Sequence, residues 1–221
     1  MAFSSVMVTL GIVWVLFYES FSFFKTISLW SFLTDSQWTP LFEDAHYGIM
    51  PLVSGTVVTT LVAVSVAIPL GTVIAIYLSE YAPHKLREIV KPLLELLSAV
   101  PTVVYGYFAL LFVTPLLQKM MPDLPGFNML AAGLVMGVMI IPYISSLSED
   151  AMRAVPMHIR EGSYAMGATR FQTAIKVIFP SALSGITSAY ILGFSRAVGE
   201  TMIVAIAAGL QPNLTWNGTL F

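Results

Sequence analysis

The chain has 221 residues, of which 57% are hydrophobic and 10% are charged, and its formal net charge is −2. Its mean hydropathy of +0.84 excludes an ordinary soluble domain, so we expect an all-α polytopic membrane protein. The small net charge does not suggest nucleic acid as a partner. The absence of cysteine excludes disulfides and thiolate metal sites, and the histidines lack metal-ligand spacing, so no metal site is expected.

Apolar segments long enough to cross a bilayer occur five times along the chain. The first is expected to be a retained helix rather than a signal peptide, because no basic residue precedes it and no convincing cleavage site follows. All five belong to a single expected transmembrane domain over residues 1–221. The expected spans are residues 3–24, 52–78, 92–117, 129–147 and 181–210.

Two of these spans contain residues that favour a polar path or a break. The second opens with hydroxyl groups that include Ser54 and Thr56. Such residues can line a polar path, but they also let membrane helices pack closely, and the sequence leaves both interpretations open. The third contains Pro101, which can interrupt a membrane helix where neighbouring groups satisfy the freed backbone.

A polar stretch separates the fourth span from the fifth, within an expected loop over 149–180. Gly167 can adopt a left-handed conformation and end a short helix that carries Glu161. Thr169, with Gln172 three residues later, has the pattern of a capping box that begins a second helix. We therefore expect two short helices that meet at a glycine and dock on another protein.

Lysine and arginine are distributed unevenly among the loops. The loops after the second and fourth spans hold seven of these residues, whereas the loops after the first and third spans hold two. Because basic residues concentrate on the cytoplasmic side, the 149–180 loop is expected in the cytoplasm, with the C-terminal end outside.

Arg196 and Glu200 form the ionised pair expected deep inside the fifth span, where each charge costs roughly 2.5–3.5 kcal/mol on insertion scales. They can neutralise each other one turn apart, although Arg before Glu is the poorer order for such a pair. We favour a role on a transport path. The guanidinium group offers a planar fork of donors to an oxyanion, and the carboxylate can accept a hydrogen bond from protonated phosphate but not from sulfate.

The polar stretch resembles the EAA loop of ABC-importer permeases, whose pattern is Glu-Ala-Ala, three residues, Gly, nine residues, then Ile-x-Leu-Pro. Gly162 and Ser163 stand here for the two alanines, and Val177 and Phe179 stand for Ile and Leu. In that family the loop forms coupling helices that sit in a groove of the cytoplasmic ATPase. The resemblance implies a coupling role for Glu161, Gly162, Ser163, Gly167, Thr169, Phe171 and Pro180.

Strings at 47–60, 98–107, 139–147 and 195–204 resemble phosphate-specific permeases of the PstC type. In that family the Arg and Glu of the last string lie on the translocation path, which implies the same for Arg196 and Glu200. Such permeases usually have six spans, so a type I ABC-importer permease fold is expected with five spans present and a sixth helix beyond the given residues. The candidate path residues are Arg196, Glu200, Thr201, Ser54 and Thr56.

The resemblance implies a non-catalytic permease subunit of an ATP-driven phosphate importer in the bacterial inner membrane. The expected partners are a second phosphate permease subunit, a cytoplasmic ABC ATPase dimer that binds ATP and Mg, an external phosphate-binding protein and the lipid bilayer. No lysine follows a glycine, so the chain has no Walker A loop and no cofactor of its own is expected. The alternatives are a permease for sulfate, molybdate or phosphonate and, in a different class, a stand-alone secondary transporter, for which inverted repeats would be expected and none is seen.

Overall fold

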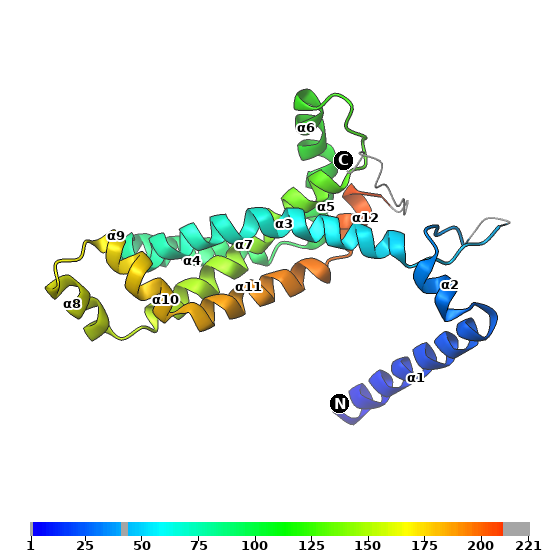
Figure 1. Cartoon of the computed structure of the whole chain (residues 1–221), viewed down its shortest axis with the longest axis horizontal. Coiled ribbons are helices and arrows are strands. Elements are labelled where there is room, and N and C mark those ends of the chain that lie inside the picture. Colours follow the sequence, from blue (N-terminus) through cyan, green and yellow to red (C-terminus); the bar gives the residue numbers. More distant parts are fainter. Residues whose placement is uncertain (1, 41–43, 210–221) are drawn as a thin grey trace. The chain divides into compact units, whose positions relative to one another are not determined.

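The computed structural model describes residues 2–40 and 44–209, which fall into a smaller compact unit that ends at Gly55 and a larger one that begins at Thr56. The regular elements of the described residues are all helices (Figure 1), apart from one isolated β-bridge between Trp38 and Tyr47. The predicted all-α class is therefore confirmed.

The smaller unit contains α1 (Ala2–Thr26) and α2 (Leu29–Thr34). Aromatic rings hold the two helices together, because the ring of Phe23 packs edge-on against Phe32 and Tyr47 at centroid distances of 5.8 and 5.5 Å. The apolar side chains of α1 are otherwise largely exposed, as suits a helix that is surrounded by lipid or by other membrane helices.

The larger unit is a helical bundle in which several helices contain or adjoin a π-helical turn (labelled η). Its first helix, α3, begins in the smaller unit. The elements are α3 (Met50–Ile76), η1 (Tyr77–Tyr81), α4 (His84–Ser98), α5 (Thr102–Phe108), η2 (Ala109–Val113), α6 (Thr114–Met120), α7 (Met129–Arg153), α8 (Met157–Ala165), α9 (Arg170–Thr173), η3 (Ala174–Ile178), α10 (Phe179–Ser181), α11 (Leu183–Val198) and α12 (Met202–Ala207).

Helix α7 is at the centre of the larger unit, beside α3 and α11 (Figure 1). Its N-terminus is capped by Asn128, whose side chain accepts a hydrogen bond from the backbone N–H of Ala131 at 2.7 Å. A Cβ added at Gly133 would lie 2.7 Å from Val62, and one at Gly137 would lie 2.8 Å from a backbone oxygen of α3. Small residues thus bring the two helices into close contact, which stabilises helix pairs in membranes.

Among the described residues, four helices are long and apolar enough to cross a membrane, and a fifth span is present if a bent pair counts as one. The bent pair consists of Arg170–Ser181 and Leu183–Val198, which meet at 74°. The first four expected spans each overlap one of the four continuous helices, and the fifth, 181–210, overlaps the second half of the bent pair. The four continuous helices are Ser4–Thr26, Met50–Tyr81, Thr102–Met120 and Met129–Arg153.

The third span differs from its prediction over 92–117. Residues up to Ser98 form the separate helix α4, and a break at residues 99–101 precedes α5, for which Pro101 is the N-cap. Proline has no N–H to donate and restricts the residue before it, so the predicted interruption at Pro101 is confirmed while the predicted start at 92 is wrong.

The fourth and fifth spans also differ from prediction. Helix α7 continues to Arg153, so Glu149 lies within a helix and not in the expected 149–180 loop. The sequence predicts one helix over 181–210, but the structure divides its described part into α11 and α12 at residues 199–201. Residue 210 and the C-terminal end expected outside the membrane lie beyond the described residues.

Candidate functional site

The predicted pair of short helices is present, and its glycine has the expected conformation. Gly167 follows α8 with φ of +80°, in the left-handed region that glycine adopts without strain. Its N–H donates to the carbonyl oxygen of Tyr164 at 2.9 Å, and the next N–H, of Ala168, donates to that of Ser163 at 3.2 Å. These two bonds form a Schellman motif, which satisfies the last carbonyl groups of α8.

The second short helix begins with the predicted capping box. The Thr169 hydroxyl accepts from the N–H of Gln172 at 3.3 Å, and the Gln172 side chain accepts from the N–H of Thr169 at 2.9 Å. The hydroxyls of Ser163 and Thr173 lie 2.8 Å apart and join α8 to α9. Two of the residues expected to serve coupling, Ser163 and Thr169, thus hold the helix pair in shape.

Apolar side chains of this helix pair point away from the rest of the chain. Met166 is 88% exposed, Phe171 65% and Met157 61%, whereas Ile178 on the same stretch is buried in the bundle. Glu161, Gly162 and Pro180 are also exposed. A Cβ at Gly162 would contact nothing within 4 Å, so this position has room for the alanine of the EAA pattern. The pair presents an uncovered apolar surface, and its role in docking stays a prediction.

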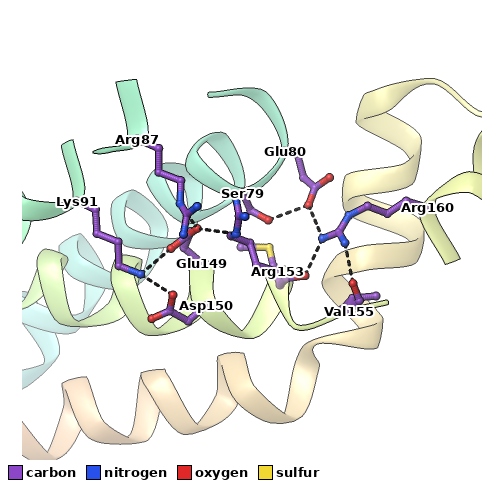
Figure 2. A network of polar contacts seen from close by, with 10 residues as sticks. Ser79, Glu80, Arg87, Lys91, Glu149, Asp150, Arg153, Val155 and Arg160 are labelled. Carbon is purple, nitrogen blue, oxygen red and sulfur yellow. Dashed lines mark hydrogen bonds and ion pairs between the residues drawn. The ribbon is translucent and has the colours of Figure 1, made fainter. Parts of the chain in front are cut away.

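A cluster of charged side chains joins α4 to the C-terminal end of α7 (Figure 2), and we call it the Glu149 cluster. The side chain of Glu149 is fully buried. Arg87 Nε lies 2.7 Å from Glu149 Oε1, and Lys91 Nζ lies 3.0 Å from Oε2. Lys91 also binds Asp150, and Arg153 approaches Glu149 Oε1 at 3.6 Å. The buried carboxylate is therefore surrounded by three cations from two helices.

The electrostatics of Lys91 follow from this arrangement. Partial burial acts to lower the pKa of Lys91, but hydrogen bonds to Asp150 and Glu149, together with their negative charges, outweigh that effect. The pKa of Lys91 consequently lies above its ordinary value, and the lysine stays charged throughout the physiological range.

Arg160 fastens the first of the short helices to the end of α7 (Figure 2). Its guanidinium donates to the carbonyl oxygens of Val155 at 2.7 Å and Met152 at 2.8 Å, which lie where α7 ends. It also donates to Glu80 Oε1 at 3.2 Å, and the side chain of Glu80 is only 5% exposed. Since Glu80 belongs to η1 at the end of α3, Arg160 joins α8 to two membrane-length helices at once.

Sequence reasoning missed both the Glu149 cluster and the contacts of Arg160. Two patterns could have indicated the cluster, namely the spacing of Arg87 and Lys91 on one helix face and the i, i+4 pair of Glu149 and Arg153. Both patterns are also typical of solvated helix surfaces. Only the packing of α4 against α7 shows that Glu149 is buried between them.

The predicted path residues Arg196 and Glu200 lie on the two sides of the break between α11 and α12. Arg196 is in the last turn of α11, and Glu200 precedes α12, where its Oε1 accepts from the N–H groups of Met202 at 3.1 Å and Ile203 at 3.4 Å. A cation at a helix C-terminus and an anion at an N-terminus each gain about 0.3–1 kcal/mol from the helix dipole. Each charge is therefore stabilised by a helix end.

Within the described residues no ion pair joins Arg196 to Glu200. Arg196 is exposed, and its guanidinium carbon lies 5.7 Å from the centre of the Tyr143 ring on α7, within cation–π range. The interpretation in which the two charges neutralise each other one turn apart is wrong, because the break at residues 199–201 ends the helix on which it depends.

The other predicted path residues lie at the break and near the start of α3. Thr201 is exposed at the same break. The hydroxyl of Ser54 donates to the carbonyl oxygen of Pro51 within α3 at 2.9 Å, and Thr56 is exposed on the same helix. Ser54 belongs to the smaller unit, so the structure does not place it relative to Arg196. The path roles of all three residues stay predictions.

The described residues thus combine membrane-length helices, an exposed pair of short helices and a broken helix that carries opposite charges. Residues 67–218 match the family described as "Binding-protein-dependent transport system inner membrane component", and the chain belongs to this family. Together with its membrane-length helices, this makes it a multi-pass inner-membrane protein.

Several curated relatives are transport permeases. The chain is 40% identical over 178 residues to a probable ABC transporter permease protein, YqgH, of Bacillus subtilis, covering 80% of this chain and 58% of the relative. It is 34% identical over 212 residues to the phosphate transport system permease protein PstC of Xylella fastidiosa, covering 86% and 65%. The corresponding Pasteurella multocida protein is also 34% identical, over 211 residues, covering 87% and 64%.

The predicted resemblance to permeases of the PstC type is thereby confirmed, and the chain spans 58–65% of the length of these relatives. A chain from inward-facing structures of the methionine ABC transporter MetNI has the same fold. The TM-score is 0.51 at 24% identity, covering 69% of this chain and 68% of that one. The predicted ABC-importer permease fold is confirmed.

Proposed function

We propose that this chain is a permease subunit of an ATP-driven importer of inorganic phosphate, in which Arg196 and Glu200 contact the anion during its passage. The PstC relatives support phosphate as the substrate, although another relative is described only as a probable ABC transporter permease. The observation that carries the proposal is the position of Arg196 and the absence of a carboxylate partner for it among the described residues. Arg196 lies at a helix break inside a membrane protein with its donors free of any carboxylate among the described residues.

A free guanidinium fork suits a tetrahedral oxyanion, because two parallel N–H groups can bind two of its oxygens. Glu200 uses one oxygen, Oε1, for the backbone of α12, and the other can accept a hydrogen bond from a phosphate that carries a proton. Broken helices with charged groups at the break are also typical of binding sites in transporters.

The same proposal gives the α8–α9 pair the role of docking a cytoplasmic ATPase dimer that binds ATP and Mg. Its support is the exposed apolar surface around Met166 and Phe171, together with the attachment of α8 by Arg160 to the ends of α3 and α7. A movement imposed on α8 would then reach those membrane helices directly. A second permease subunit and an external phosphate-binding protein complete the proposed importer.

The experiment is uptake by the complete transporter in proteoliposomes with its binding protein and ATP. We expect phosphate to be transported and to stimulate ATP hydrolysis. Sulfate, molybdate and phosphonate are tested in the same assay, and we expect none of them to replace phosphate as the substrate. Arg196→Gln should reduce uptake by at least tenfold without reducing assembly, whereas Lys119→Gln, which removes one exposed positive charge on α6, should not. Undiminished uptake in Arg196→Gln would contradict the proposed role.

Coupling is tested by two matched glycine changes on the same element. Gly167→Ala should strain the left-handed turn by about 1 kcal/mol and weaken ATPase binding. Gly162→Ala adds the same methyl group inside α8, where there is room for it, and should leave binding intact. Equal ATPase binding by both variants would contradict the docking role.

Orientation is tested by single cysteines in this cysteine-free chain. An impermeant thiol reagent applied to intact cells should label a cysteine at Asp35 but not one at Thr169, because the proposal places the coupling pair in the cytoplasm. Labelling at Thr169 alone would invert the topology.

A further inference from the structure

Among the described residues, Arg196 has an aromatic ring beside it and no acid paired with it. A carboxylate close to an arginine takes up its charge, as Glu149 does with Arg87, whose Nε lies 2.7 Å from Glu149 Oε1. The face of an aromatic ring attracts the guanidinium charge through its quadrupole and does not occupy the N–H groups at the edge of the group. Tyr143, 5.7 Å from the guanidinium carbon, can therefore hold Arg196 while leaving its fork available.

Tyr143 lies on α7 beside a close approach of α7 and α11, and it makes one long hydrogen bond to the end of α4. It follows the buried Pro142 in α7, and its hydroxyl donates a long hydrogen bond of 3.5 Å to the carbonyl oxygen of Ser98, where α4 ends. Next to it, a Cβ added at Gly193 of α11 would lie 2.9 Å from Ile144 of α7. The spacing between the helices that carry the ring and the guanidinium is thus set by close packing beside the pair.

We infer that Tyr143 is a positioning residue for Arg196, and this inference rests on the proposed function. Its ring holds the guanidinium beside the break between α11 and α12, so that the N–H fork meets the anion already oriented. Preorganisation of this kind lowers the entropy lost on binding and so affects affinity more than the rate of later steps. The ring carries this role, because the hydroxyl adds only the long 3.5 Å hydrogen bond to Ser98.

The test uses the complete reconstituted transporter, with the KM and maximal rate of phosphate uptake measured separately. Tyr143→Leu removes the ring and should raise KM about fivefold, with the maximal rate per assembled complex changed less than twofold. Tyr143→Phe keeps the ring and should change KM less than twofold. An unchanged KM in Tyr143→Leu, or an equal rise in both variants, would overturn the inference.

A pentafluorophenylalanine incorporated at position 143 provides a second variant in case Tyr143→Leu assembles poorly. It keeps the shape of phenylalanine but removes the negative charge of the ring face, so KM should again rise about fivefold relative to Tyr143→Phe. Equal KM values for the pentafluorophenylalanine variant and Tyr143→Phe would show that the ring contributes packing alone and would overturn the inference.

The dependence on Arg196 is tested in an Arg196→Lys background. Lysine keeps the charge, and with it the attraction to the ring, but lacks the planar N–H fork that the ring orients, so Tyr143→Leu should now raise KM less than twofold. The same fivefold rise in both backgrounds would show that Tyr143 acts independently of Arg196. The two proposals can fail separately. If Arg196→Gln abolishes uptake but Tyr143→Leu leaves KM unchanged, only the positioning role of Tyr143 is contradicted. If Arg196→Gln leaves uptake undiminished, the proposed function itself is contradicted.

Discussion

The Glu149 cluster and the break that carries Arg196 and Glu200 place charged groups in the same apolar bundle in opposite ways. In the cluster a fully buried carboxylate is surrounded by three cations. At the break an exposed cation and a partly exposed anion are each stabilised by a helix end and do not pair. The first arrangement satisfies its charges within the protein, and the second leaves a guanidinium available to something else.

Whether a charge is paired within the protein distinguishes a structural role from a binding role more clearly than its depth in the membrane does. A buried carboxylate without its cations would be strongly unfavourable, so the cluster holds α4 against α7. The helix ends at the break stabilise each charge without occupying all of its hydrogen-bonding groups. Pairs of variants, one from each region where the chain offers them, test this contrast.

The largest effect is expected when the same substitution is made in both regions. Glu149→Gln leaves three cations around a neutral amide and should lower the free energy of unfolding by about 3 kcal/mol. Glu200→Gln keeps an oxygen that can accept from Met202 and Ile203, so its loss should stay below about 0.5 kcal/mol. Unfolding of both variants in an SDS mixed-micelle titration measures the difference, and equal stabilities would remove the contrast.

A second effect, of about 2 kcal/mol, is expected at the attachment of α8. Arg160→Met leaves the carbonyl oxygens of Met152 and Val155, and the nearly buried carboxylate of Glu80, without this donor. Arg170→Met removes an exposed arginine from the next short helix and should change stability by less than about 0.5 kcal/mol. The same titration compares them, and a wild-type midpoint for Arg160→Met would show that the attachment adds no stability.

Exchange of the two charges at the break should cost about 1 kcal/mol. The double variant Arg196→Glu with Glu200→Arg puts an anion at the C-terminus of α11 and a cation at the N-terminus of α12, and both are unfavourable to the helix dipole. Phosphate uptake should be lost as well, because the guanidinium moves to the other side of the break. Normal stability and uptake in the exchanged protein would indicate an interchangeable pair.

The smallest effect concerns Lys91. Lys91→Met should lower the free energy of unfolding by about 0.5 kcal/mol, since Arg87 and Arg153 remain beside Glu149, while Lys85→Met on the exposed side of α4 should have no measurable effect. The pKa of Lys91 is raised in the folded state, so its contribution is fully present below the ordinary lysine pKa of about 10.4. It should then fall as the pH rises through the raised value. A difference between Lys91→Met and wild type that vanished already at pH 8 would contradict this assignment.

Local patterns in the sequence predicted the features that depend on a few neighbouring residues. The left-handed Gly167, the capping box of Thr169 and Gln172, and the interruption at Pro101 are all present, because backbone sterics and adjacent side chains decide them. The four continuous membrane-length helices of the described residues each overlap an apolar segment of the sequence, since bilayer thickness sets the length of such a segment.

Tertiary structure decided how the charged residues are used. The polar face of α4 and the end of α7 both resemble solvated helix surfaces in the sequence, and only their packing buries Glu149 among cations. In the same way, Arg196 and Glu200 have the spacing of a local pair until the chain breaks between them and Tyr143 approaches from α7. The burial and partners of a charge depend on residues distant in the chain, so a pattern within one helix does not determine them.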